Sequence, residues 1–287
     1  MDKLLFIRVD GGKDDGLGHI KRCISISNII EKNKNFIEPI FLINKNNKTS
    51  KEILKNNNKL FFEVNGKVNS RNELIDLKKL LNFDKNKIIL LDSKRISKNY
   101  VNYLKKFATV VLFEDEKSFN SNSDLVINNN IWANNFYKNK KNKLLGLKFN
   151  TIPKGFFKKN SFDNNSNKIL ISLGGEDPDN LTLKILSLIY KSISNLKFII
   201  ILGHSYPNKS LVKDFCNKEN INNQIIYSPE DISLHLTKLR LVISAGGLSC
   251  YEFAAAGLPQ LIVVLAKHQN LLAKSMQSYN CAKILTN

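Results

Sequence analysis

Leu4-Leu5-Phe6-Ile7-Arg8-Val9, followed by Asp10-Gly11-Gly12-Lys13-Asp14-Asp15-Gly16-Leu17-Gly18-His19, is the stretch that decides the fold. The apolar run is typical of a buried strand, and apolar residues recur at helical spacing from Ile20 onward. A strand, a glycine-rich loop and a helix start in this order form a site for an anionic group, because backbone N–H groups and the helix dipole favour negative charge there. We expect Gly16 and Gly18 to admit a ligand close to the backbone, and His19 to carry the chemistry.

The same loop lacks the third glycine of a dinucleotide-binding fingerprint. Lys21 stands three positions after Gly18, where that fingerprint has glycine or alanine. We therefore predict no nucleotide cofactor of the Rossmann type, and no cofactor of another kind is indicated.

The composition is that of a globular protein large enough for two domains: 287 residues, 43% hydrophobic and 24% charged. No apolar run approaches the roughly 20 residues of a membrane helix, and the first strand follows directly on the N-terminus. We therefore expect a cytoplasmic protein without stable membrane insertion. The four cysteines and four histidines are scattered, so no metal site is predicted.

The formal charge of +19 raises the alternative of a nucleic-acid-binding protein. However, only five of the 44 basic residues are arginine, and the lysines are spread through asparagine-rich loops. A nucleic-acid interface more often concentrates its basic residues and uses arginine forks on phosphates and bases. We therefore predict no nucleic-acid partner, although the positive charge would favour an acidic substrate.

Apolar runs alternate with helical patterns along both halves of the chain, which indicates parallel sheets. Strands are predicted at 36–43, 59–64, 87–92, 108–113 and 125–128, and again at 169–173, 198–202, 224–227, 241–244 and 261–265. The fold class is therefore α/β, with two Rossmann-like domains, 1–152 and 168–287, joined by a Pro-, Gly- and Asn-containing linker at 153–167. Asp179 or Asn180 is a plausible N-cap for a helix from Leu181. Carboxylates follow three predicted strands, at Asp10, Asp92 and Glu114-Asp115, where the ligand crevice of such a sheet lies.

Three motifs together resemble one family. Arg8-x-Asp10 with Gly16-x-Gly18-His19-x-x-Arg22-Cys23 is similar to the signature of UDP-sugar hydrolases of the pseudaminic acid pathway. Leu173-Gly174-Gly175-x-Asp177-Pro178-x-Asn180 resembles their second motif, and Ser244-Ala245-Gly246-Gly247-x-Ser249-x-Tyr251-Glu252 the third. These hydrolases are relatives of the two-domain, MurG-like GT-B glycosyltransferases, and the likeness extends over essentially the whole chain.

The resemblance implies a GT-B arrangement with an inter-domain cleft and a metal-independent hydrolysis. His19 would act as general base on a water that attacks the anomeric carbon, with Asp10 orienting His19 or the water. UDP would leave, its diphosphate held at Gly18, Gly174-Gly175 and Gly246-Gly247. Glu252 would accept hydrogen bonds from the ribose, and Gln269 would lie near the sugar. We expect the remaining substrate contacts from these residues: Arg8, Gly16, Asp92, Asp177, Ser249 and His268.

Two departures from the family pattern concern the sugar. The family usually has Asp-His-Tyr after the fourth strand, where this chain has Asp92-Ser93-Lys94, and an Asn-Gln pair where this chain has His268-Gln269. A GT-B glycosyltransferase that transfers a sugar from a UDP-sugar to an acceptor is the alternative. The oligomeric state is not predicted.

Overall fold

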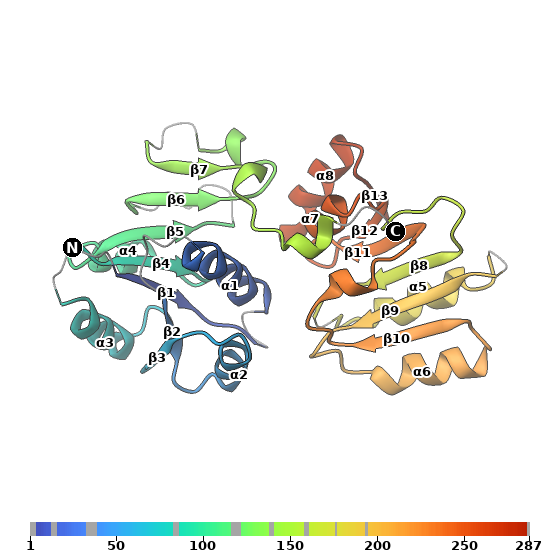
Figure 1. Cartoon of the computed structure of the whole chain (residues 1–287), viewed down its shortest axis with the longest axis horizontal. Coiled ribbons are helices and arrows are strands. Elements are labelled where there is room, and N and C mark those ends of the chain that lie inside the picture. The colour runs from blue at the N-terminus through green and yellow to red at the C-terminus, as the bar shows by residue number, and fades with distance from the viewer. Residues whose placement is uncertain are drawn as a thin grey trace. The chain divides into compact units, whose positions relative to one another are not determined.

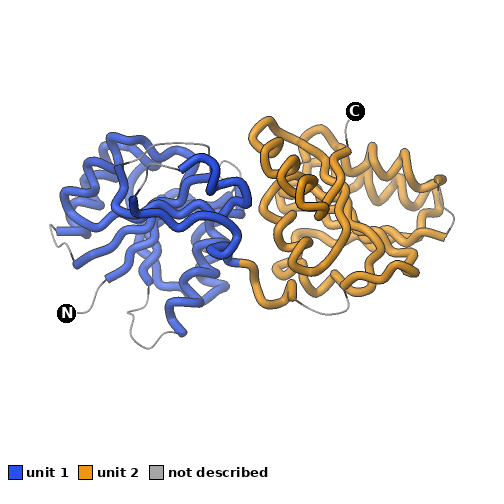
Figure 2. Tube along the Cα trace, turned by 90° about the horizontal axis from the view of Figure 1, so that it is seen from above, with its two compact units in different colours: residues 1–151 blue, residues 152–287 orange. Residues whose placement is uncertain are grey.

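The computed structural model describes residues 4–12, 16–32, 39–82, 86–115, 122–137, 141–157, 161–175, 177–192 and 195–285. The chain divides into two compact units, residues 1–151 and 152–287, each an α/β layer structure (Figures 1 and 2). The prediction of two Rossmann-like α/β domains is confirmed. Among the described helices, none combines the length and the apolar character that a membrane crossing requires.

Unit 1 contains a parallel sheet in the order β3-β2-β1-β4-β5-β6-β7. Its strands are β1 (Leu5–Val9), β2 (Ile40–Asn44), β3 (Phe61–Val64), β4 (Ile88–Asp92), β5 (Thr109–Phe113), β6 (Leu125–Asn128) and β7 (Lys143–Leu145). Its helices are α1 (Gly18–Glu31), α2 (Lys48–Asn56), α3 (Arg71–Leu81) and α4 (Lys98–Leu104), with short 3-10 turns at Ala133–Asn135 and Leu147–Phe149.

Both faces of the central strands β1, β2 and β4 are buried, which explains why these strands are almost continuously apolar. Alternation along β1 sends Phe6 towards α3 and α4, and Ile7 and Val9 towards α1 and α2. Arg8 points to the same face of the sheet as Phe6. Its side chain therefore lies in the interior between the sheet and α3, where it pairs with Glu73.

Unit 2 repeats this plan with the parallel order β10-β9-β8-β11-β12-β13. Its strands are β8 (Lys168–Ser172), β9 (Lys197–Leu202), β10 (Asn223–Tyr227), β11 (Leu241–Ala245), β12 (Gln260–Val263) and β13 (Ala282–Leu285). Its helices are α5 (Leu181–Ile189), α6 (Lys209–Lys218), α7 (Ser249–Ala255) and α8 (Asn270–Ser278), with 3-10 turns at Lys154–Phe157, Ile232–His235 and Lys267–Gln269.

Several boundaries differ from the predicted ones. The strand predicted from Phe36 begins at Ile40, and residues 36–38 lie outside the described part of the chain. Strands β7 and β13 were not predicted because each is short and contains lysine, and their assignment depends on pairing with β6 and β12. The segment predicted as a linker is built into unit 2, since Phe156 is buried against α7 and Phe162 forms a bridge to Leu239.

Candidate functional site

The centre of the candidate site in unit 1 is a buried pair of His19 and Asp92. Asp92 ends β4 and His19 lies in the first turn of α1, which starts beside β1, the neighbour of β4 in the sheet. The imidazole Nδ1 lies 2.6 Å from Asp92 Oδ1. His19 is 8% exposed and Asp92 only 1%, so water competes little for this hydrogen bond.

Arg22 fixes the position of that pair from the next turn of α1. Its Nε and Nη2 donate to the two oxygens of Asp92 at 2.9 and 2.6 Å, and its Nη1 and Nη2 donate to those of Asp115 at 2.8 and 2.9 Å. The guanidinium also lies 4.3 Å from the ring centre of Phe113. The planar guanidinium donates to two carboxylates at once, with two hydrogen bonds to each, and no other side chain can do this.

The electrostatics define which nitrogen of His19 can act as a base. The positive charges of Arg22 and His19 hold the pKa of Asp92 well below its usual range in spite of burial, which acts in the opposite direction. An ionised carboxylate only accepts hydrogen bonds, so Nδ1 carries the proton and Nε2 is left to accept one. Burial lowers the pKa of His19, but the charge and hydrogen bond of Asp92 and the charge of Asp115 outweigh it, and the net pKa is raised above 6.5.

His19, Asp92 and Asp115 also form a group whose ligand atoms lie within 4.8 Å of one another. Such a group could hold a metal ion. The Arg22 guanidinium, however, already bonds both carboxylates, so the chain supplies the positive charge that an ion would bring. We assign no metal to this group.

Asp10 and Arg8 differ from their expected roles. The residue that orients His19 is Asp92, whereas Asp10 Oδ2 pairs with Arg8 Nη1 at 2.7 Å and Asp10 Oδ1 accepts from the Asn44 backbone N–H at 2.8 Å. Arg8 is 1% exposed and also pairs with the buried Glu73, so its guanidinium organises the interior instead of facing a ligand. Asp92, likewise predicted to touch substrate, is enclosed by its partners.

The glycine-rich loop before α1 is closed on itself. Gly12 and Gly16 exchange backbone hydrogen bonds of 3.2 and 2.7 Å, which brings the two ends of the loop together. Gly16 has φ of +73° and no atom within 4 Å of where a Cβ would stand, and Gly18 is the first residue of α1. Residues 13–15 of the predicted motif lie outside the described part of the chain.

In unit 2 the two Gly-Gly loops follow β8 and β11, which are neighbouring strands, so both lie at the carboxyl edge of the sheet. The first glycine of each pair is required by the fold. Gly174 has φ of +91°, and a Cβ on Gly246 would come within 2.9 Å of Gln269 Cβ. The second glycines, Gly175 and Gly247, have open space on that side. A glycine that the fold does not require is consistent with a backbone that a ligand approaches closely.

Asp177 belongs to the fold as well as to the motif. Its two carboxylate oxygens accept from the backbone N–H groups of Leu181 and Thr182, both at 2.8 Å, and they thereby cap α5. Asn180 occupies the N-cap position but its own side chain does not cap; its Oδ1 accepts from the Tyr206 hydroxyl. The predicted position of the cap was right, and the side chain that provides it is Asp177.

The other predicted residues of unit 2 lie along the same edge. Ser249 and Glu252 are half-buried in the first turn of α7, directly after Gly247. His268 is exposed in the turn before α8, and Gln269 Oε1 accepts from the Leu265 backbone N–H at 2.9 Å. Gln269 therefore supports the loop that packs on Gly246.

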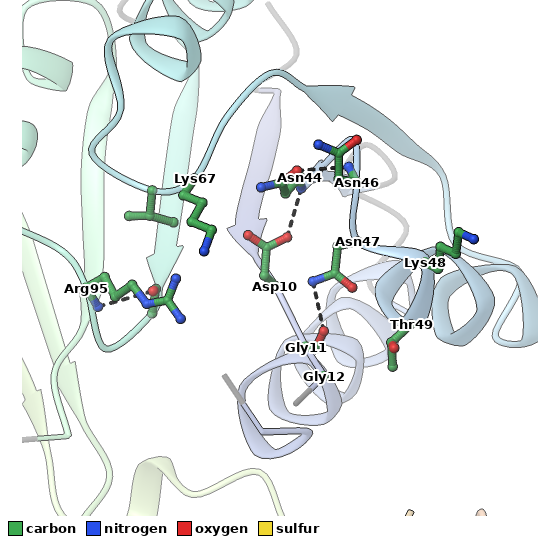
Figure 3. A pocket seen from close by; sticks show the side chains of 12 residues that line it. Asp10, Gly11, Gly12, Asn44, Asn46, Asn47, Lys48, Thr49, Lys67 and Arg95 are labelled. Atoms are coloured by element: carbon green, nitrogen blue, oxygen red, sulfur yellow. Dashed lines mark hydrogen bonds between the residues drawn. The ribbon is translucent and has the colours of Figure 1, made fainter. Parts of the chain in front are cut away.

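A pocket of about 400 Å³ opens in unit 1 at the carboxyl ends of β1, β2 and β4. One wall is formed by Asp10 and Gly11–Gly12, and Arg95 lies on another (Figure 3). Ser93 is also among the lining residues. The loop after β1 leads to His19 and the loop after β4 starts directly after Asp92, so the pocket is lined by the two loops that adjoin the His19–Asp92 pair.

The role of Arg22 and Asp115 in bracing His19 was missed from sequence. Arg22 stands in the quoted motif three residues after His19, a spacing that places both on one side of a helix. Asp115 was noted only as a carboxylate at a strand end. Spacing within α1 was a usable signal for Arg22, whereas no local pattern joins Arg22 to a partner 93 residues away.

Comparison with known proteins agrees with the two-unit description. Residues 168–287 match the family model of the glycosyltransferase family 28 C-terminal domain. The uncharacterized protein MJ1062 of Methanocaldococcus jannaschii is 26% identical over 279 residues, 92% of this chain and 55% of that protein. The spore coat polysaccharide biosynthesis protein SpsG of Bacillus subtilis is 28% identical over 116 residues, 40% of this chain and 34% of that protein. The chain thus spans about half the length of one relative and a third of the other.

Solved structures resemble the whole chain. MurG of Acinetobacter baumannii superposes with a TM-score of 0.71 at 14% identity, covering 99% of this chain and 86% of that one. HepE of Anabaena, solved in complex with UDP-glucose, gives a TM-score of 0.58 at 9% identity, covering 96% and 89%. At these identities the likeness concerns the fold alone. The chain has a GT-B glycosyltransferase-like fold, similar to MurG, whose C-terminal unit matches glycosyltransferase family 28.

Proposed function

We propose that the protein is a hydrolase that cleaves UDP from a UDP-linked 2,4-diacetamido-2,4,6-trideoxy sugar, of the kind that precedes pseudaminic acid. The observation that carries this proposal is the His19–Asp92 pair with its 2.6 Å bond at Nδ1. A buried imidazole held in one tautomer by a carboxylate is the arrangement of a general base. The three motifs of the pathway hydrolases support the choice of substrate.

In the proposed reaction, His19 Nε2 removes a proton from a water molecule while the water oxygen attacks the anomeric carbon. The bond between that carbon and the phosphate oxygen breaks, and its electron pair leaves with UDP. The imidazolium that forms is stabilised by the adjacent Asp92 charge, which Arg22 holds in place. The raised pKa of His19 suits this role, because a stronger base accepts the proton more readily.

We assign the nucleotide to unit 2. The open space beside Gly175 and Gly247 would let a diphosphate approach the backbone of both loops, and Glu252, in the first turn of α7, would accept hydrogen bonds from the ribose hydroxyls. HepE, with the same fold, has been solved with UDP-glucose, and SpsG acts in polysaccharide biosynthesis according to its name. Both support a nucleotide-sugar substrate.

A glycosyltransferase is the second candidate, favoured by the family 28 match over residues 168–287. The same His19 would then deprotonate an acceptor hydroxyl instead of water. The two reactions share the donor and differ in the nucleophile.

UDP release separates these two functions. We would measure it from a panel of UDP-sugars with water as the sole acceptor, for the wild type and His19→Ala. Release of UDP and free sugar that is lost in His19→Ala, with UDP binding retained, supports the hydrolase. UDP binding without release from any donor would rule the hydrolase out and leave the transferase.

A further inference from the structure

We propose that His204, in the loop after β9, is a binding residue for the diphosphate of the nucleotide. This inference rests on the proposed function, because it takes the first Gly-Gly loop of unit 2 as part of the diphosphate site. His204 lies outside the three sequence motifs. The reason to assign it a role is the contact between its loop and the backbone of Gly174-Gly175.

The loop after β9 packs directly on the first Gly-Gly loop. A Cβ placed on Gly203 would stand 2.4 Å from Gly175 Cα and 2.5 Å from the Gly174 carbonyl oxygen, so a glycine is needed for the two backbones to come this close. Two residues further on, the Ser205 backbone N–H donates to the Gly175 carbonyl at 3.1 Å. His204 stands between these two contacts. The fold therefore holds His204 beside the backbone that the diphosphate would approach.

The hydrogen bond from Ser205 also makes the first Gly-Gly loop better suited to an anion. A carbonyl oxygen carries partial negative charge and would repel a phosphate next to it. The Gly175 carbonyl oxygen is engaged by the Ser205 N–H, whereas the side of Gly175 on which a Cβ would stand has no atom within 4 Å. A phosphate that enters this open space would approach the loop on a side that the Gly175 carbonyl does not face.

The start of α5 cannot supply the positive charge that a diphosphate needs. The N–H groups of Leu181 and Thr182 both donate to Asp177, which is 3% exposed. These two groups are therefore engaged, and the Asp177 charge offsets the positive end of the helix dipole. An imidazole N–H can donate to a phosphate oxygen, and a protonated imidazole would do so with a full positive charge. His204 is thus placed to compensate the charge that α5 leaves unbalanced.

His204 is accessible, and the backbone that carries it is anchored. The side chain is exposed, and its imidazole makes no hydrogen bond or ion pair with another residue that the structure describes. Tyr206 is 4% exposed and donates its hydroxyl to Asn180 Oδ1, which ties the loop after β9 to the start of α5. An exposed side chain on an anchored backbone can contact a ligand without a rearrangement of the loop, which lowers the cost of binding.

The test is calorimetric binding to the full chain of UDP and of uridine, which lacks the diphosphate. We compare the wild type, His204→Ala, His204→Lys and the control Lys218→Ala. Lys218 is exposed in the last turn of α6, a helix that starts at the carboxyl edge of the sheet and ends at the opposite edge. Both positions are exposed, so all variants are expected to fold normally, which circular dichroism checks.

We expect His204→Ala to bind UDP about tenfold more weakly and uridine as well as the wild type does. His204→Lys should retain most of the UDP affinity, because an ammonium group also pairs with a phosphate. Lys218→Ala should behave as the wild type. An equal loss of UDP and uridine affinity in His204→Ala, or a His204→Lys variant as weak as His204→Ala, would overturn the inference.

Failure of this inference and failure of the proposed function give different results. Unchanged UDP affinity in His204→Ala would overturn the inference and leave the nucleotide site intact. A wild type that binds no UDP would overturn both. UDP release by the wild type is a separate readout, so loss of the hydrolase alone would leave the role of His204 standing.

Discussion

The role that we propose for His19 as a base depends on residues that are distant from it in sequence. Without Asp92, burial alone would lower its pKa; with Asp92 and Asp115 the pKa is raised above 6.5. Because the base must be deprotonated to act, activity of the wild type should rise as pH increases through that raised pKa. The acid limb of the pH profile is therefore a direct report on the His19–Asp92 pair.

Asp92→Asn tests this pair. The substitution removes the charge and allows the wrong imidazole tautomer, so we expect kcat/KM to fall by roughly 10³-fold. The residual activity should have its acid limb at lower pH than the wild type, because the pKa of His19 falls. The measurement is kcat/KM against pH for UDP release, with circular dichroism as a control for folding. An unchanged acid limb would contradict the role given to Asp92.

Arg22→Lys tests whether the Arg22 guanidinium holds the His19–Asp92 pair in position. A lysine ammonium cannot bond both oxygens of Asp92 and both of Asp115, and it lacks the planar group that faces Phe113. We expect kcat to fall by roughly tenfold or more, with little change in KM, because in the proposed mechanism Arg22 acts through His19 and has no contact with substrate. An increase in KM at unchanged kcat would instead place Arg22 in the substrate site.

At the scale of elements, Asp177→Ala and Gly247→Ala are expected to have opposite effects on stability and on UDP binding. Asp177→Ala removes two hydrogen bonds at the start of α5, so the free energy of unfolding of unit 2 should decrease by about 1 kcal/mol. UDP affinity should be nearly unchanged. Gly247→Ala should leave stability nearly unchanged, since a Cβ meets no atom within 4 Å, and weaken UDP binding about tenfold. Chemical denaturation and calorimetric titration of both variants measure the two quantities; the reverse pattern would contradict both assignments.

The same elements show how far the sequence could be interpreted. The alternation of strands and helices was predictable because both faces of each sheet are covered, which makes strands such as β4 and β9 continuously apolar. His19 could be proposed as a candidate base from its place between a strand, a glycine loop and a helix. Its partner was not, since Asp10 and Asp92 both end strands, and only side-chain geometry shows that Arg8 takes one and His19 the other.

At the scale of the whole molecule, the charge of +19 would suggest a nucleic-acid partner. Two of the five arginines, however, are engaged in buried ion pairs and do not face a phosphate. Arg8 is committed to Glu73 and Asp10, and Arg22 to Asp92 and Asp115. Both are buried and serve the interior of unit 1. The charge that remains is mostly on surface lysines, which would raise the local concentration of any acidic ligand without specifying one.

The two units have separate hydrophobic cores, so each should unfold in its own transition. Trp132, the single tryptophan of the chain, is buried in unit 1 and reports on that unit alone. If UDP binds at the glycine loops of unit 2, UDP at 100 times its Kd should stabilise unit 2 by about 2.7 kcal/mol and raise its Tm by roughly 10 °C.

Differential scanning calorimetry should therefore show one transition moving with UDP concentration while the Trp132 fluorescence transition stays in place. Gly247→Ala, which keeps the core of unit 2 intact, should lose about half of the calorimetric shift at the same UDP concentration, because a tenfold weaker Kd lowers the stabilisation to about 1.4 kcal/mol. A shift in tryptophan fluorescence with no movement of the second transition would assign the nucleotide to unit 1. In that case the open backbones of Gly175 and Gly247 would need another ligand, and the diphosphate would have to be bound by the glycine loop before α1.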